Sequence, residues 1–162
     1  LDDSIERTRQ LTLEMRPPVL SELSFGDALE WLADRIQQQH GLEVKFSDDD
    51  QPKPLDEELR SVLFLGVREV LTNVVKHARA SVAEVTLRRE GNMLQISVQD
   101  DGIGFPAEKL SNNNSDGSGF GLFNVRERMQ RFGGRLAIDA ATGKGTRVTL
   151  VVPLGANIPS TT

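Results

Sequence analysis

A polar stripe recurs at every fourth residue of one segment: Glu69, Asn73 and His77, with Lys76 beside its end. On an α-helix this spacing places the three side chains on one face. Mg²⁺ takes few protein oxygens together with waters and substrate phosphates, so a carboxylate and an amide oxygen could hold it while the basic end balances phosphate charge. Polar residues four apart also form the ordinary solvent face of many helices, and the stripe alone does not establish a site.

A second group follows an alternating segment that ends at Asp100, with Gly102 and Gly104 directly after it. A carboxylate at a strand end can accept a hydrogen bond from an exocyclic amine such as that of adenine. Glycines there allow the backbone to approach a flat ligand closely. The other interpretation is an ordinary Asp-Gly turn.

Further glycines, Gly117, Gly119 and Gly121, precede Leu122 at the start of a helical pattern. Small residues at a helix N-terminus expose free amides that can bind an anion. A dinucleotide fingerprint is not indicated, because no strand of a βαβ unit comes before these glycines, and no GxxxxGK[ST] loop occurs. A flexible hinge is the alternative. Thr146 follows a Gly-Lys-Gly turn and begins a strand-like run, which the turn alone would explain.

The remaining pattern predicts a mixture of helices and hairpins. Apolar spacing of three and four residues predicts helices over 1–15, 24–40, 55–78 and about 120–132. Alternating segments predict strands over 42–46, 82–89, 93–99, 136–139 and 147–152. The clearest strand pairs are hairpins, which excludes a doubly wound parallel sheet. We therefore expect the α/β class, as a two-layer α/β sandwich with a mixed sheet and helices packed on one face.

Composition bounds the class of protein. A chain of 162 residues fits one domain, and 19 Lys and Arg against 24 Asp and Glu give a net charge of −5. That balance argues against direct nucleic-acid binding, which needs a basic face. With no cysteine, disulfides, thiolate metal sites and Cys nucleophiles are excluded. No apolar run approaches the roughly 20 residues of a membrane span, so we expect a cytoplasmic domain, whose parent protein could still be anchored in a membrane.

Taken in order, these motifs resemble the ATP-binding domain, or Bergerat fold, of the family that contains gyrase, Hsp90, MutL and sensor histidine kinases. The similar segments are REVLTNVVKHA over 68–78, DDGIGF over 100–105 and GSGFGLFNVRERM over 117–129. The resemblance covers about 25–153. LTLEMRPPVL over 11–20 and NVRERM over 124–129 are similar to nitrate-sensor-like histidine kinases, which regulate helix-turn-helix response regulators.

For the polar stripe, the resemblance implies the chemistry of a Mg-ATP site. Asn73 would ligate Mg²⁺, and Glu69 would orient a water in the second coordination shell. Lys76 and His77 would face the phosphates, where losing a countercharge should weaken nucleotide binding.

For the glycine motifs, the resemblance implies that Asp100 accepts a hydrogen bond from the adenine amino group. Gly102 and Gly104 would shape the pocket, and Thr146 would support the base through its hydroxyl or a water. Residues 105–116 would be a lid that orders on nucleotide. The residues that would bound the lid and contact the phosphates are Gly117, Gly119, Gly121 and Leu122.

The resemblance also implies a division of the chain and a set of partners. Residues 1–18 would end a helix of the dimerisation and phosphoacceptor domain, 19–155 would be the ATP-binding domain, and 156–162 a loose tail. The partners would be ATP, that missing domain and a response regulator with a helix-turn-helix output. The full-length protein would be a homodimer, whereas the fragment would be a monomer.

The reaction implied is transfer of the γ-phosphate to a histidine. This chain has only His40 and His77, and neither fits the acceptor, so we expect ATP binding without autophosphorylation by the fragment alone. One alternative is a hydrolytic ATPase similar to gyrase or MutL, with Glu69 as general base. The other is a protein-binding module that keeps the fold and has lost the nucleotide.

Overall fold

A computed structural model describes residues 18–104 and 118–155, with the backbone alone for 118–120. Within these ranges the helices are α2 (Val19–Glu22), α3 (Phe25–His40), α4 (Glu57–Asn73), the π-helical turn η1 (Val74–Ala78) and α6 (Ser118–Gln130). The strands are β1 (Glu43–Asp48), β2 (Val82–Glu90), β3 (Met93–Asp100), β4 (Arg135–Ala140) and β5 (Thr146–Pro153). The predicted helix over 1–15, the predicted lid over 105–116, Gly117 and the predicted tail over 156–162 lie outside the described residues.

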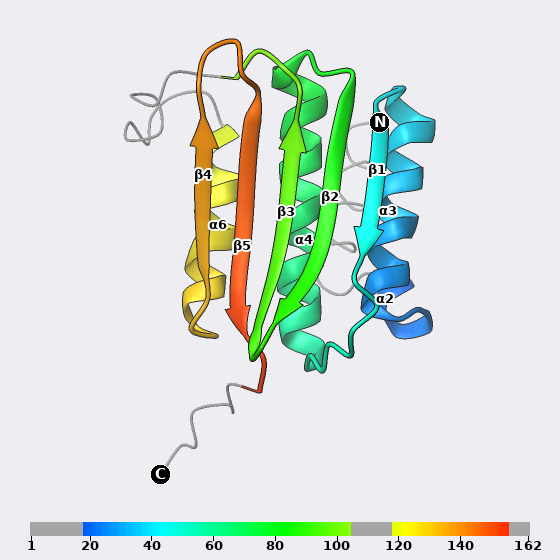
Figure 1. The fold of residues 1–162 in the computed structure, drawn as a ribbon, viewed down its shortest axis with the longest axis vertical. Coiled ribbons are helices and arrows are strands. Elements are labelled where there is room, and N and C mark those ends of the chain that lie inside the picture. The colour runs from blue at the N-terminus through cyan, green and yellow to red at the C-terminus, as the bar shows by residue number, and fades with distance from the viewer. Residues whose placement is uncertain (1–17, 105–117, 156–162) are drawn as a thin grey trace, which may run out of the picture.

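The strands form one mixed sheet in the order β1-β2-β3-β5-β4. Only β1 and β2 pair in parallel, connected by α4, and the other described pairs are antiparallel. Figure 1 shows α4 and α6 behind the sheet and α3 alongside β1, with no helix over the near face. The predicted two-layer α/β sandwich is therefore confirmed.

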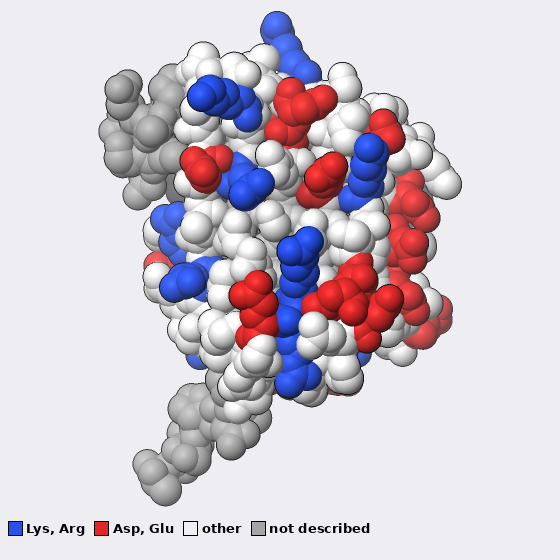
Figure 2. All heavy atoms as spheres, in the orientation of Figure 1, with Lys and Arg blue, Asp and Glu red and all other residues white. Residues whose placement is uncertain are grey.

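The two faces of the sheet differ as the alternation predicts. Apolar side chains of the inner face are buried against the helices, among them Ala83, Val85, Leu87, Leu94, Ile96 and Val98. Polar and charged side chains cover the outer face, among them Glu84, Arg88, Gln99, Asp139 and Arg147. Figure 2 shows both signs of charge intermixed over this face. Neighbouring strands complement one another here, since Arg147 donates to Gln99 and lies opposite Asp139 in the register.

Local capping fixes the ends of the two long helices. The Ser24 hydroxyl accepts a hydrogen bond from the Asp27 amide at the start of α3, and Gly41 ends that helix with a φ of 73°. At the start of α4, the Asp56 carboxylate accepts from the Leu59 amide at 2.7 Å. No helix among the described residues is long and apolar enough to cross a membrane.

The predicted helix over 55–78 differs from the structure at its end. The α-helical ladder stops at Asn73, and the next five residues form the wider π turn η1 before Arg79 leaves it in the left-handed conformation with a φ of 51°. The short helix α2 was not predicted either, because four residues are too few to show a period. The other predicted helices and strands within the described residues match the observed ones to within about two residues.

A lysine clamp organises the loop between β1 and α4. The Lys53 ammonium lies 2.6 Å from Asp48 and 2.5 Å from Asp49, and also donates to the Gln51 carbonyl. Hydrogen bonds from Lys53, and then from the backbone amides of Arg89 and Gln51, hold the pKa of Asp49 well below its usual value. Because the Asp49 carboxylate accepts from the Arg89 amide at 2.7 Å, the clamp also fastens the loop to β2.

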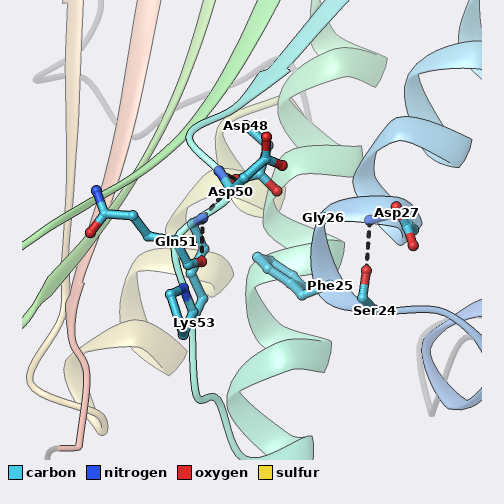
Figure 3. A pocket seen from close by; sticks show the side chains of 9 residues that line it. Ser24, Phe25, Gly26, Asp27, Asp48, Asp50, Gln51 and Lys53 are labelled. Carbon is cyan, nitrogen blue, oxygen red and sulfur yellow. Dashed lines mark hydrogen bonds and ion pairs between the residues drawn. The ribbon is translucent and has the colours of Figure 1, made fainter.

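The clamp borders a pocket of about 310 Å³ at the N-terminal turn of α3 (Figure 3). Asp48 lies so close to Gly26 in that turn that a Cβ there would collide with the carboxylate. In the register, Asp48 lies level with Leu87, whereas Asp100 lies level with Ala83 at the other end of β2. The pocket is thus at the opposite end of the sheet from Asp100.

Replacing Lys53 should destabilise the domain, since its side chain is only 6% exposed and its loss leaves two neighbouring carboxylates without their partner. We expect Lys53→Met to lower the free energy of unfolding by about 1–3 kcal/mol in urea titrations at neutral pH. Lys45→Met, on the exposed face of β1, is the matched control and should change stability by less than about 0.5 kcal/mol. Equal effects of the two substitutions would contradict a stabilising clamp.

Two glycines of the β4–β5 turn should respond differently to alanine. Gly143 has a φ of 80° and open space within 4 Å of the position that a Cβ would occupy, while Gly145 has a φ of 73° and faces the Asp100 carbonyl. Gly143→Ala should cost about 1–2 kcal/mol of stability for the left-handed backbone alone. Gly145→Ala adds a steric clash and should cost about 2–5 kcal/mol in the same urea titration. A Gly143→Ala cost as large as that of Gly145→Ala would contradict the close approach.

Candidate nucleotide-binding site

The last residue of β3, Asp100, is a buried carboxylate, only 4% exposed. It accepts a hydrogen bond from the Gly102 amide at 2.8 Å and another from the amide of Thr146, its partner in the β3–β5 register. Burial raises the pKa of Asp100, the two amides oppose that rise, and the charge of Asp101 adds to it. A carboxylate has about four acceptor positions, so two amides leave room for a ligand amino group.

The turn after Asp100 packs tightly against the end of the long helix. A Cβ on Gly102 would collide with the carbonyl of Ala78, the last residue of η1. That carbonyl accepts a hydrogen bond from the Ile103 amide at 2.8 Å. Glycine is required at 102 for this contact, and Figure 1 shows the end of β3 beside the end of the α4 ribbon.

The opposite side of the turn packs against the β4–β5 connection. Gly104, with a φ of 62°, faces the Ala141 carbonyl at a distance that excludes a Cβ. The Ile103 carbonyl accepts from the Gly143 amide at 2.7 Å. Gly145 is equally close to the backbone of Asp100, so three glycines permit the contacts around this carboxylate. The structure therefore brings together the predicted residues Asp100, Gly102, Gly104 and Thr146.

A groove of about 310 Å³ runs between α4 and α6. Its lining includes Glu69, Lys76 and Gly121 from the predicted set, together with Arg68, Asn124 and Arg128. The Glu69 carboxyl lies directly on the backbone of Gly121, where a Cβ would overlap it. A glycine in the first turns of α6 thus lets an acidic side chain of α4 approach the N-terminal end of that helix, where the dipole favours negative charge.

The other predicted residues occupy defined places around these two features. Asn73 is the last residue of α4 and half-buried, while Lys76 and His77 are exposed on η1. Leu122 is half-buried and packs against the core. Gly119 lies in the first turn of α6, where the backbone alone is described.

The turn η1 connects the two parts of the site. Lys76 lines the groove, and two residues later Ala78 holds the turn that follows Asp100. A ligand with a flat amine-bearing ring at Asp100 and an anionic chain at the groove would therefore lie along η1.

Three contributors to the site were not predicted from the sequence: Gly145, the Ala78 carbonyl and Asp101. Gly145 carries a signal, a glycine directly before a β-branched strand residue, but that pattern is common in plain turns. A backbone carbonyl leaves no signal in the sequence. Asp101 forms part of the recognised DDGIGF segment, but the sequence pattern gave a role only to Asp100, at the end of the predicted strand.

Comparisons with known proteins show the family of this chain. The family model described as "Histidine kinase-, DNA gyrase B-, and HSP90-like ATPase" matches residues 59–156. A sensor-like histidine kinase of Chloroflexus aurantiacus is 35% identical over 150 residues, covering 90% of this chain and 25% of the relative. The oxygen sensor histidine kinase NreB of Staphylococcus carnosus is 31% identical over 150 residues, covering 93% of this chain and 42% of the relative.

Solved structures show the same likeness. The blue-light activated histidine kinase of Erythrobacter litoralis EL346 aligns with a TM-score of 0.73 and 25% identity, over 96% of this chain and 50% of that one. This chain thus spans between a quarter and a half of the length of these relatives. The match to the family model extends over more than half of the sequence, and the chain belongs to the family of histidine kinase-, DNA gyrase B- and HSP90-like ATPases.

Proposed function

We propose that this chain binds ATP with Mg²⁺ and supplies the γ-phosphate for transfer to a histidine on a dimerisation domain, as the catalytic part of a two-component sensor kinase. The observation that carries the proposal is the buried Asp100 carboxylate, whose turn packs on η1 while Lys76 of η1 lines the α4–α6 groove. The curated relatives are named as sensor histidine kinases, which favours phosphotransfer over the hydrolytic and nucleotide-free alternatives.

In this proposal Asp100 selects the base. Its ionised carboxylate accepts from the 6-amino group of adenine, whereas guanine would present a carbonyl oxygen there and repel it. Gly102 and Gly104 let the backbone approach the ring, and Thr146 supports the base from the neighbouring strand.

The groove end of the site would receive the phosphates. The first turn of α6, with Gly119 and Gly121, offers backbone amides at the positive end of a helix dipole. Lys76 and His77 lie on η1, exposed at the position where phosphates would enter, and Lys76 adds countercharge. Fixed positive groups of this kind stabilise the charge that develops during phosphoryl transfer.

Two side-chain oxygens of α4 would hold the magnesium ion, Glu69 in the lining of the groove and Asn73 outside that lining. Asn73 offers an uncharged amide oxygen, and Glu69, one helical turn earlier, offers a carboxylate that can hold a metal-bound water. Bound Mg²⁺ would neutralise phosphate charge. The role of the chain is then to orient the triphosphate along η1.

The acceptor histidine would belong to a different domain. Of the two histidines, His40 lies in the last turn of α3, where a dipole-compensating role suffices, and His77 lies in η1 beside the proposed phosphate position. We propose that the acceptor is on a dimerising helical domain, which makes the complete kinase a homodimer, and that a response regulator with a helix-turn-helix output receives the phosphoryl group next.

Two substitutions should separate recognition of the base from recognition of the metal. By calorimetric titration of Mg-ATP, Asp100→Ala should lose about 10- to 100-fold in affinity, because a hydrogen bond to a charged group is removed. Adding Mg²⁺ should raise the affinity of the unmodified chain for ATP. This increase should be absent in Asn73→Ala. Asp139→Ala, which removes an exposed carboxylate of the outer sheet face, should bind normally.

Two outcomes of that titration would count against the proposal. Absence of saturable heat with the unmodified chain would support a nucleotide-free module. Equal heat from the unmodified chain, Asn73→Ala and Asp100→Ala would reject the roles proposed for these two residues. Rapid steady-state hydrolysis that Glu69→Ala abolishes would support the hydrolytic ATPase instead.

The affinity for ATP should also depend on pH through Asp100. Burial raises the pKa of this carboxyl above its ordinary 3.8, and only the ionised form is a full acceptor, so affinity should be highest above the pKa and fall as the pH drops through it. The ATP phosphates also change protonation with pH. The pH dependence of ATP affinity in Asp100→Ala, which lacks the carboxyl, therefore serves as the control. As the pH drops from about 8 to about 4, the dissociation constant should rise more steeply for the unmodified chain than for Asp100→Ala. Parallel curves would contradict the role given to Asp100.

A further inference from the structure

Asp101 is placed quite differently from its neighbour Asp100. Its side chain is exposed, and its Oδ1 accepts hydrogen bonds from the backbone amides of Ser81 at 2.8 Å and Val82 at 3.0 Å. Its own amide donates to the Val82 carbonyl at 3.2 Å. None of these contacts is used in the proposed binding of ATP, so the function leaves the arrangement unexplained.

These bonds hold the connection that leaves η1. Between Ala78 and Ser81 the chain reverses from helix to strand, with Arg79 in the left-handed conformation at a φ of 51°. The Ile103 amide binds the Ala78 carbonyl on one side of this reversal, and the Asp101 carboxylate binds the Ser81 and Val82 amides on the other. The turn after Asp100 is therefore hydrogen-bonded to this connection at both of its ends.

The charge on Asp101 strengthens its hydrogen bonds. Hydrogen bonds from Val82, and then from Ser81, hold the pKa of the Asp101 carboxyl below its usual value. The group is therefore ionised at neutral pH, and amide hydrogen bonds to an ionised acceptor are stronger than those between neutral groups.

We propose that Asp101 is a positioning residue for selection of the base: it fixes the turn that presents Asp100 and keeps that turn in register with η1. The inference rests on the proposed function, because it assumes that Asp100 reads an exocyclic amine. Loss of the Asp101 carboxylate would leave the Asp100 side chain present but less well aimed. The preference for a base that carries the exocyclic amine would then fall more than the affinity that comes from the phosphates.

Base selection can be measured by comparing ATP with purine riboside triphosphate, which lacks only the 6-amino group. In calorimetric titrations with Mg²⁺, the unmodified chain should prefer ATP by about tenfold or more, the equivalent of one hydrogen bond to a charged acceptor. Asp101→Ala should reduce that preference to about twofold to threefold while the affinity for purine riboside triphosphate changes by less than about threefold.

Two further variants separate positioning from charge and from folding. Asp101→Asn keeps an oxygen at the same reach and should retain most of the preference for ATP. Asp101→Glu keeps the charge but moves the oxygens by one methylene, and should lower the preference toward that of Asp101→Ala. The comparison of Asn with Glu also provides the test if Asp101→Ala proves too unstable to titrate.

The outcomes distinguish this inference from the proposed function. An unmodified chain that binds no nucleotide, or binds the two triphosphates equally, would contradict the function itself. A preference for ATP that is as large in Asp101→Ala and Asp101→Glu as in the unmodified chain would overturn positioning by Asp101. An equal loss of affinity for both triphosphates in Asp101→Ala would also overturn positioning by Asp101, because a merely structural role predicts that result.

Discussion

Burial of the Asp100 carboxylate is the constraint on which the candidate site depends. A carboxylate removed from water is costly unless donors replace the lost hydration. Here two backbone amides do so, one from its own turn and one from the adjacent strand β5. The sheet fixes the Thr146 donor, and packing against Ala78 fixes the Gly102 donor, so the carboxylate has a set direction before any ligand arrives. Binding then requires little reordering of the chain.

That direction can persist only because three pieces of backbone approach one another without side chains between them. Gly102 permits contact with the end of η1, and Gly104 and Gly145 permit contact with the β4–β5 connection. The connections that converge here are far apart in the sequence. Ala78 contacts one side of the turn after Asp100, and Ala141 contacts the opposite side. A site of this kind is as rigid as the packing of the sheet, which suits recognition of a flat ring.

The sequence was sufficient for most of the fold because the periods are clear. Alternation identified the outer and inner faces of β2 and β3. The cap at Asp56 was missed, because the helix was predicted to begin at residue 55. Within the site, Asp100, Gly102 and Gly104 were predictable as a set from the order of the motifs and their resemblance to the ATP-binding domain. Their individual contacts were not, because the bond between Ile103 and the Ala78 carbonyl and the bonds of Asp101 join residues about 20 or more positions apart in the sequence.

The helix that ends at this site begins at the other end of the molecule. Arg60, in the first turns of α4, donates to the Leu23 carbonyl at 2.8 Å and so ties the approach to α3 to the start of the helix. An α-helix of this length is stiff along its axis, and a shift at its beginning moves its far end by nearly the same amount. A slide of one residue, about 1.5 Å, would be enough to break the 2.8 Å bond between Ile103 and Ala78. The helical segment from α4 to η1 thus connects the residues that precede α3, bound at the Leu23 carbonyl, with the turn after Asp100, bound at the Ala78 carbonyl.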